Sequence, residues 1–173
     1  MSIVDIAARD LLYRRIGEVM VAHGYVSVSP YWYKCADEVT TTLFIENYHS
    51  GFLFYISLGV YVGGITSSMP MKQPRLGKLH AYARLEQLTR VTTTDANNRV
   101  VLEIGKETEN AKIVDEAVGT VATIGVGVAD ELLTIDGIRR VLERYGDSRW
   151  TIQPVLREKL FGRNDFPLPG VKV

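Results

Sequence analysis

A run of strict two-residue alternation, from Phe52 to Val62, constrains the fold of this chain more than any other feature. Its large apolar side chains occupy every second position: Phe52, Phe54, Ile56, Leu58, Val60 and Val62. The positions between them carry a more amphipathic set: Leu53, Tyr55, Ser57, Gly59 and Tyr61. Because successive side chains of a β-strand point to opposite sides, the run predicts a strand with one face in the core.

Two shorter runs precede it, and both are rich in the aromatic and β-branched residues that favour strands. They cover Tyr31–Ala36 and residues 39–48, and they are bounded by the turn-forming groups Asp37-Glu38 and His49-Ser50-Gly51. Links this short join antiparallel strands, since a parallel pair needs a crossover of about a dozen residues or more. The three runs therefore predict a β-meander.

We expect the sheet to continue beyond a long loop at residues 63–77, where Pro and Gly recur without a sustained period. Residues 78–89 alternate again, which predicts a fourth strand with Ala81 and Ala83 on its inner side. A turn is expected at residues 95–98 and one more short strand at residues 100–104.

Helical periodicity frames this predicted sheet on both sides. Apolar residues recur at spacings of three and four over residues 3–23, with Ser2 as the expected N-cap and Gly24 as the residue that ends the helix. The same period returns over residues 107–133, and there we expect close packing or a break near Gly125 and Gly127. A last long helix is predicted at Ile135–Tyr145.

The order of elements predicts the α+β class. A helix, then four or five antiparallel strands, then helices packed on one face of the sheet is the expected architecture. We expect a single domain over residues 1–173, divided into a helix (1–24), an antiparallel sheet (25–105), helices (106–146) and an extended tail (147–173) with one short helical turn. The opposite face of the sheet is expected to be solvated or available to a partner.

Composition excludes several classes of function. Twenty basic residues balance twenty acidic ones, which disfavours nucleic-acid binding because phosphate contacts need an excess of Lys and Arg. The longest uncharged stretch, residues 117–129, is too short to span a bilayer, which needs about 20 apolar residues. A single cysteine and a start without a basic segment predict a cytoplasmic protein, and Cys35 itself is expected to be a small buried side chain.

No metal or cofactor is expected. The three histidines have no ligand spacing, so a zinc site has no support in the sequence. Gly125-Val126-Gly127 lacks the third glycine and the preceding strand of a dinucleotide loop, and no Gly-Lys-Ser or Gly-Lys-Thr occurs.

The richest polar group of residues follows the fourth predicted strand. Two-residue spacing places His80, Tyr82, Arg84 and Glu86 on one face of it. Neighbouring strands could add Glu46 and Tyr48, or Tyr55 and Tyr61, depending on register. An arginine among carboxylates and phenols can hold an anionic group with two hydrogen bonds, or it can be a hot spot for a partner. The alternative is an ordinary solvated face with weak cross-strand ion pairs.

Three phrases of the chain resemble a known family: Tyr31-Trp32-Tyr33, the run from Phe52 to Tyr61, and the phrase from His80 to Leu88. They are similar to landmarks of an uncharacterised bacterial and phage-associated family, domain of unknown function 4304. The resemblance implies the same α+β order and points to His80 and Arg84 as the polar positions of interest. It implies no activity, since none is assigned to that family.

Three functions stay open at this point. The first is a non-enzymatic protein-binding role, as in a partner-specific inhibitor or immunity-like protein, with Tyr55, His80, Tyr82, Arg84 and Glu86 as candidate binding residues. The second is a small hydrolase or transferase, in which His80 and a nearby glutamate exchange protons and Arg84 holds an anion. The third is a phage-related structural or assembly role, which predicts a homo-oligomer.

Overall fold

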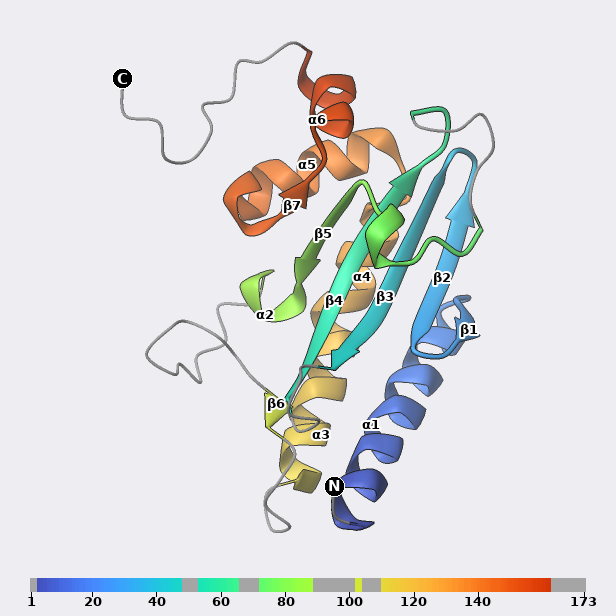
Figure 1. The fold of residues 1–173 in the computed structure, drawn as a ribbon, viewed down its shortest axis with the longest axis vertical. Helices are drawn as coiled ribbons and strands as arrows, with labels where there is room; N and C mark the ends of the chain where they lie inside the picture. The colour runs from blue at the N-terminus through green and yellow to red at the C-terminus, as the bar shows by residue number, and fades with distance from the viewer. Residues whose placement is uncertain (1–2, 48–52, 66–71, 89–101, 104–109, 163–173) are drawn as a thin grey trace.

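The protein is α+β, as the order of sequence patterns predicts (Figure 1). A computed structural model describes residues 3–47, 53–65, 72–88, 102–103 and 110–162. The expected turn at residues 95–98 and the expected N-cap Ser2 lie outside these residues.

The strands form one antiparallel sheet in the order β1-β2-β3-β4-β5-β7. β6 also belongs to this sheet and pairs with the beginning of β4. The strands are β1 (Val26–Val28), β2 (Tyr31–Ala36), β3 (Val39–Asn47), β4 (Leu53–Val62), β5 (Ala81–Arg84), β6 (Leu102–Glu103) and β7 (Thr151–Ile152). The meander is confirmed, and it has more strands than expected. The short strands β1 and β7 were missed because two or three residues show no measurable alternation.

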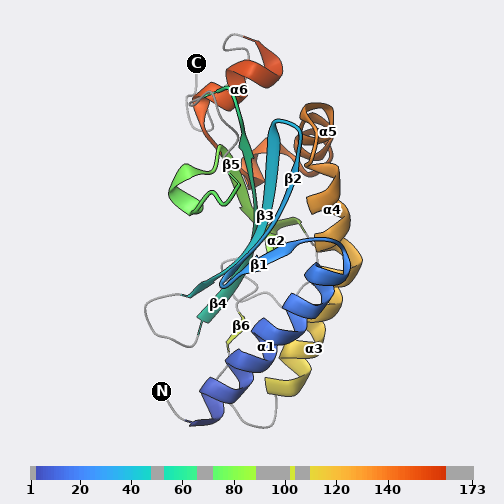
Figure 2. The same ribbon diagram turned by 90° about the vertical axis from the view of Figure 1, so that its right-hand side faces the viewer.

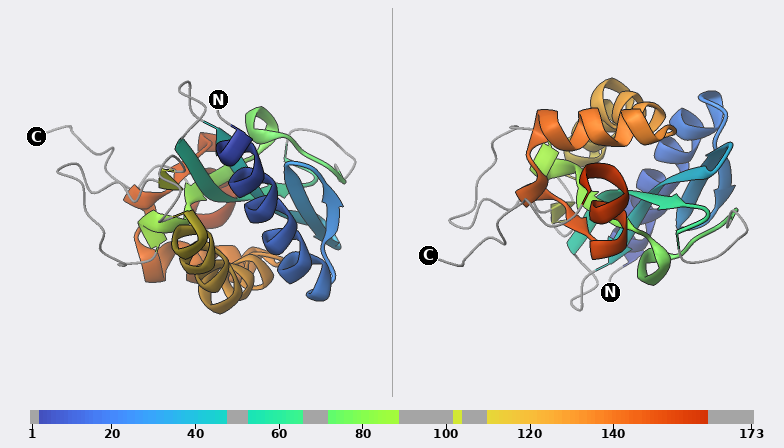
Figure 3. Two further views of the ribbon diagram at one scale, coloured as in Figure 1. Left: turned by 90° about the horizontal axis from the view of Figure 1, so that it is seen from below. Right: turned by 90° about the horizontal axis from the view of Figure 1, so that it is seen from above.

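Helices cover one side of this sheet, which we call the helix face (Figure 2). They are α1 (Ile3–Ala22), α3 (Asn110–Thr120), α4 (Val126–Glu131) and α5 (Ile135–Tyr145). Seen from below, α1 and α3 lie side by side (Figure 3), and an ion pair between Arg15 and Asp115 joins them. A shorter helix, α6 (Pro154–Phe161), follows β7. No helix of the described residues is long and apolar enough to cross a membrane.

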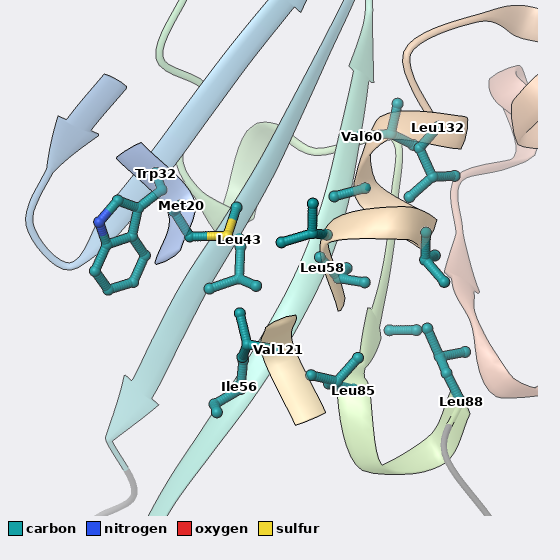
Figure 4. Close-up of a cluster of buried hydrophobic side chains, with 14 of the residues drawn as sticks. Met20, Trp32, Leu43, Ile56, Leu58, Val60, Leu85, Leu88, Val121 and Leu132 are labelled. Carbon is teal, nitrogen blue, oxygen red and sulfur yellow. The ribbon is translucent and has the colours of Figure 1, made fainter. Parts of the chain in front are cut away.

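The main core lies between the helices and the sheet (Figure 4). Alternate residues of β4 point into it, and Leu58 and Val60 have no exposed surface. Val121 and Leu132 reach the same cluster from the helical layer. The alternation that predicted β4 therefore also predicted its buried face correctly.

A π-helical turn, η2 (Val121–Gly125), connects α3 to α4 without a break. Gly125 keeps helical backbone angles, with φ of −58°. A Cβ at this position would lie 3.4 Å from a methyl of Leu85 and 3.7 Å from one of Leu43. The glycine thus serves close packing of the helix on the sheet, and the expected break is wrong.

Lys34, on β2, ties the end of α1 to α4. Its Nζ donates to the carbonyl oxygen of His23 at 3.0 Å and to Asp130 Oδ1 at 2.9 Å. The hydroxyl of Tyr25 donates to the same carboxylate oxygen at 3.1 Å. Gly24 ends α1 with a positive φ of 82°, as predicted.

The other side of the sheet, which we call the second face, is not simply solvated. A short helical turn, η1 (Leu76–Lys78), and the residues beside it cross this face opposite the helices (Figure 2). Phe44, Tyr61 and Leu79 form a second buried cluster there. The expectation of an open face is wrong here, because the covering segment has no periodic pattern that would identify its apolar side.

Candidate functional site

The register of the sheet brings four polar or aromatic side chains together on the second face. Ser57 on β4 pairs with Arg84 on β5, and Tyr55 pairs with Glu46 on β3. Residues directly opposite or two apart on one face lie within reach of each other. The sequence left open whether Glu46 and Tyr48 or Tyr55 and Tyr61 join this group. The register matches neither pair, because it joins Tyr55 to Glu46 and leaves Tyr61 in the second cluster. Tyr48 lies outside the described residues.

The guanidinium of Arg84 lies over the ring of Tyr55. The guanidinium carbon is 3.7 Å from the ring centroid, a cation–π contact. Tyr55 is 3% exposed, whereas Arg84 stays partly exposed. Among the described residues the guanidinium forms no ion pair and donates no side-chain hydrogen bond. A stacked guanidinium keeps its N–H groups in its own plane, so those donors are available to a ligand.

Ser57 and Glu46 form a hydrogen-bonded pair beside this stack. The buried hydroxyl of Ser57 donates to the carboxylate of Glu46. This bond occupies one carboxylate oxygen, while Glu46 as a whole remains partly exposed. Glu46 on β3 and Arg84 on β5 lie on either side of β4 and form no ion pair with each other.

Glu86 does not lie on the strand where the two-residue spacing placed it. The strand ends at Arg84, whose backbone N–H donates to Gln87 Oε1 at 3.3 Å, and α2 (Leu85–Leu88) begins there. Burial raises the pKa of the Glu86 carboxyl to about 7, and the charge of Glu46 adds to that effect. A backbone hydrogen bond and the charge of Arg84 oppose the rise. Glu86 is therefore about half protonated near neutral pH.

His80 is buried, in contrast to the exposed position expected from the alternation. It is 1% exposed, stacks on Tyr61 with 4.7 Å between ring centroids, and accepts a hydrogen bond at Nδ1 from the Val62 N–H. Burial lowers its pKa, so the ring is neutral. The strand begins only at Ala81, although the backbone N–H of His80 donates to the Val60 carbonyl at 2.8 Å and its carbonyl accepts from the Gln153 N–H at 2.8 Å. Tyr82 stays partly exposed and packs on the second cluster.

Cys35 is exposed, so the expectation of a buried cysteine is wrong. It lies on the second face opposite Thr40, whose hydroxyl donates to Sγ at 3.3 Å. Sγ in turn donates a hydrogen bond to the Lys72 carbonyl at 3.7 Å. Within the residues that the structure describes, no group of His, Cys, Asp and Glu could hold a metal ion.

Sequence reasoning missed a groove elsewhere in the molecule. It lies between α1 and the β1–β2 hairpin, and its volume is about 440 Å³. Its lining comprises Tyr13, Arg14, Gly17, Glu18, Val21, Ser27, Ser29 and Trp32. Gly17 within the helical pattern was the one available signal, since a glycine there lets the ring of Trp32 approach the helix.

Comparison of the chain with protein-family models, with curated proteins and with solved structures gives no match in any of the three. The resemblance to domain of unknown function 4304 therefore stays a prediction.

Proposed function

We propose that the chain is a non-enzymatic binding protein that recognises another protein through the surface around Arg84. The single observation that carries the proposal is the guanidinium stacked on Tyr55, 3.7 Å from the ring centroid, with no ion-pair partner among the described residues. Arginine and tyrosine are enriched among the residues that dominate binding energy at protein interfaces.

The preferred group on the partner is a carboxylate. Arginine binds a carboxylate with two parallel hydrogen bonds, and the ring beneath it reduces the entropy lost when those bonds form. Burial raises the pKa of Glu86 to about 7, so near neutral pH its carboxyl cancels less of the positive charge of Arg84 than a fully ionised one would. The balanced net charge of the chain supports a protein partner over a nucleic acid. An inhibitor-like or immunity-like role is proposed by analogy alone, from the size and α+β class of the domain.

The test is affinity capture from the native host with three baits: the wild type, Arg84→Ala and Arg140→Ala. Arg140 is an exposed arginine on α5 and controls for a general loss of positive charge. We expect a specific protein that the wild type and Arg140→Ala retain and that Arg84→Ala loses. Capture of the same proteins by all three baits contradicts the proposal.

A small hydrolase or transferase is the second candidate, and the raised pKa of Glu86, about 7, favours it. His80 is a poor acid or base because it is buried and its Nδ1 already accepts a hydrogen bond. Glu86 would exchange the proton and Arg84 would hold the anionic group. A panel of ester and phosphoester substrates tests this candidate. Activity with a pH midpoint near 7 that Glu86→Gln abolishes supports it, and inactivity across the panel counts against it.

The location and the family of the chain are also proposals, and both rest on the sequence. A cytoplasmic location is supported by the single cysteine, which is a free thiol in the structure. Membership in domain of unknown function 4304 is supported by the three aromatic and apolar phrases alone. A phage-related assembly role is a third candidate, and the self-association described next bears on it.

A further inference from the structure

Exposed valines gather at the β1 edge of the molecule. Val21 on α1 is 54% exposed, and Val26 and Val28 on β1 are 62% and 40% exposed. Only two other large apolar side chains of the described residues, Ile6 and Val155, are comparably exposed. Val26 and Val28 project from one face of β1, and we call these two valines the β1 edge patch, whereas Val21 lies on α1 on the helix face. Clustered exposed apolar side chains mark interaction sites, whereas scattered ones are ordinary.

The strand that carries this patch is the first of the sheet. β1 pairs with β2 on one side, and no strand of the described residues pairs with its other side (Figure 1). An edge strand presents unpaired N–H and C=O groups to any extended segment that docks there. Folded proteins commonly protect such edges with charges or proline, but β1 carries Val26, Ser27 and Val28.

The groove between α1 and the hairpin continues from this edge. At its base, the buried Nε1 of Trp32 has no hydrogen-bond partner among the described residues. Arg14 and Glu18, one helical turn apart on α1, line the groove, and neither forms an ion pair within the described residues. The edge therefore combines an apolar patch with one unpaired charge of each sign.

We infer that this edge is a self-association surface, at which β1 of a second copy of the chain pairs antiparallel with β1. A two-fold axis through Ser27 places Val26 of each copy opposite Val28 of the other. Val26 and Val28 pair with Tyr33 and Tyr31 of β2, so they lie on one face, and the axis brings four valines together there. The pairing buries the exposed valines and satisfies the backbone groups of the edge.

The same two-fold axis brings opposite charges of the two α1 helices together. Ser27 pairs with Trp32, and the indole of Trp32 lies 3.3 Å from where a Cβ of Gly17 would be. Gly17, close to the midpoint between Arg14 and Glu18, lines the same groove as Ser27 and therefore lies near the proposed axis. In the two-fold pair, the α1 helices run antiparallel, so Arg14 of each copy faces Glu18 of the other. This self-complementarity is the property of an isologous interface and is why the occupant is a second copy.

Sedimentation equilibrium of the purified chain, over concentrations up to the millimolar range, tests this inference. We expect a monomer–dimer equilibrium that Val26→Lys shifts to monomer, because lysine on an edge strand opposes pairing. Val155→Lys, at another exposed valine, on α6 and away from this edge, is the control and should dimerise like the wild type. A wild type that stays monomeric at every concentration overturns the inference, as does a dimer that Val26→Lys leaves unchanged.

Charge reversal on α1 tests whether the two copies associate through the two-fold arrangement described above. Arg14→Glu and Glu18→Arg should each weaken dimerisation on the order of tenfold, since each puts like charges together twice in the dimer. The double variant, Arg14→Glu with Glu18→Arg, restores opposite charges and should dimerise as the wild type does. Both residues are exposed, so folding should persist, and circular dichroism checks that it does. A double variant as weak as the single ones contradicts the two-fold arrangement.

The surface around Arg84 lies on different strands from this edge, so the two proposals are independent. An Arg84→Ala variant should dimerise as the wild type does, and a Val26→Lys variant should keep the partner captured through Arg84.

Discussion

The two faces of the sheet differ in how they are built. On the helix face, four helices cover a continuous apolar layer formed by alternate residues of β2 to β5. On the second face, a non-periodic segment covers only Phe44, Tyr61 and their neighbours, while Glu46, Ser57 and Arg84 form a polar group farther along the strands. One face therefore maintains the fold, whereas the other divides between a small core and a polar group, to which we assign the proposed recognition role.

The largest effect is expected from truncation of the helix face. Leu58 has no exposed surface and lies at the centre of the main core. Leu58→Ala should lower the free energy of unfolding by about 2–5 kcal/mol, from lost burial and the cavity that remains. Urea denaturation measures it. An equal loss from Leu79→Ala, in the smaller cluster, would show that the two faces contribute alike and break the comparison.

Steric crowding on the second face should have the next largest effect. A Cβ added at Gly59 would lie 2.4 Å from the Leu79 methyl Cδ1. Gly59→Ala should therefore destabilise the fold by about 1–3 kcal/mol, because a packed leucine must shift. In a double-mutant cycle, combination with Leu79→Ala should remove most of this penalty. Additive effects would mean that the covering segment does not pack on β4.

A smaller effect is expected at the polar link behind the helix face. Lys34→Met removes the hydrogen bond to the His23 carbonyl at 3.0 Å and the ion pair with Asp130 at 2.9 Å. Both side chains of the ion pair are partly exposed, so the loss should be about 1 kcal/mol. Thermal unfolding of Lys34→Met beside Lys112→Met, an exposed helix position, measures it. Equal melting temperatures would show that the link adds nothing to stability.

The last effect is a change of stability with pH rather than a loss at one pH, and it belongs to the second face. The pKa of Glu86 is about 7 in the folded chain, above its ordinary value of 4.5. Between these pH values the folded state holds more protons than the unfolded state, so the contribution of Glu86 to stability falls as pH rises. The slope cannot exceed about 1.4 kcal/mol per pH unit for one group. Glu86→Gln should flatten the stability profile between pH 5 and pH 7, which are about the limits of this window. An unchanged profile would place the Glu86 carboxyl in water.

The sequence predicted the helix face well and the second face poorly, for physical reasons. Alternation in β4 and the helical period of α5 report one-sided burial, and both elements begin or end within a residue of expectation. The covering segment around Leu79 has no period, so nothing marked the burial of His80 beneath it. Arg84 and Tyr55 were identified as candidates, but their contact depended on strand register, which is a tertiary property. Glu86 was displaced because the strand stops two residues before it.

The central claim, that Arg84 recognises a partner, is tested most directly by calorimetric titration of the captured partner into the wild type and into Arg84→Lys. Lysine keeps the positive charge but loses the planar pair of donors and the stacking on Tyr55. The account predicts that Arg84→Lys weakens binding by at least about thirtyfold, as expected for a hot spot. Equal affinity of the two proteins for the partner would contradict it.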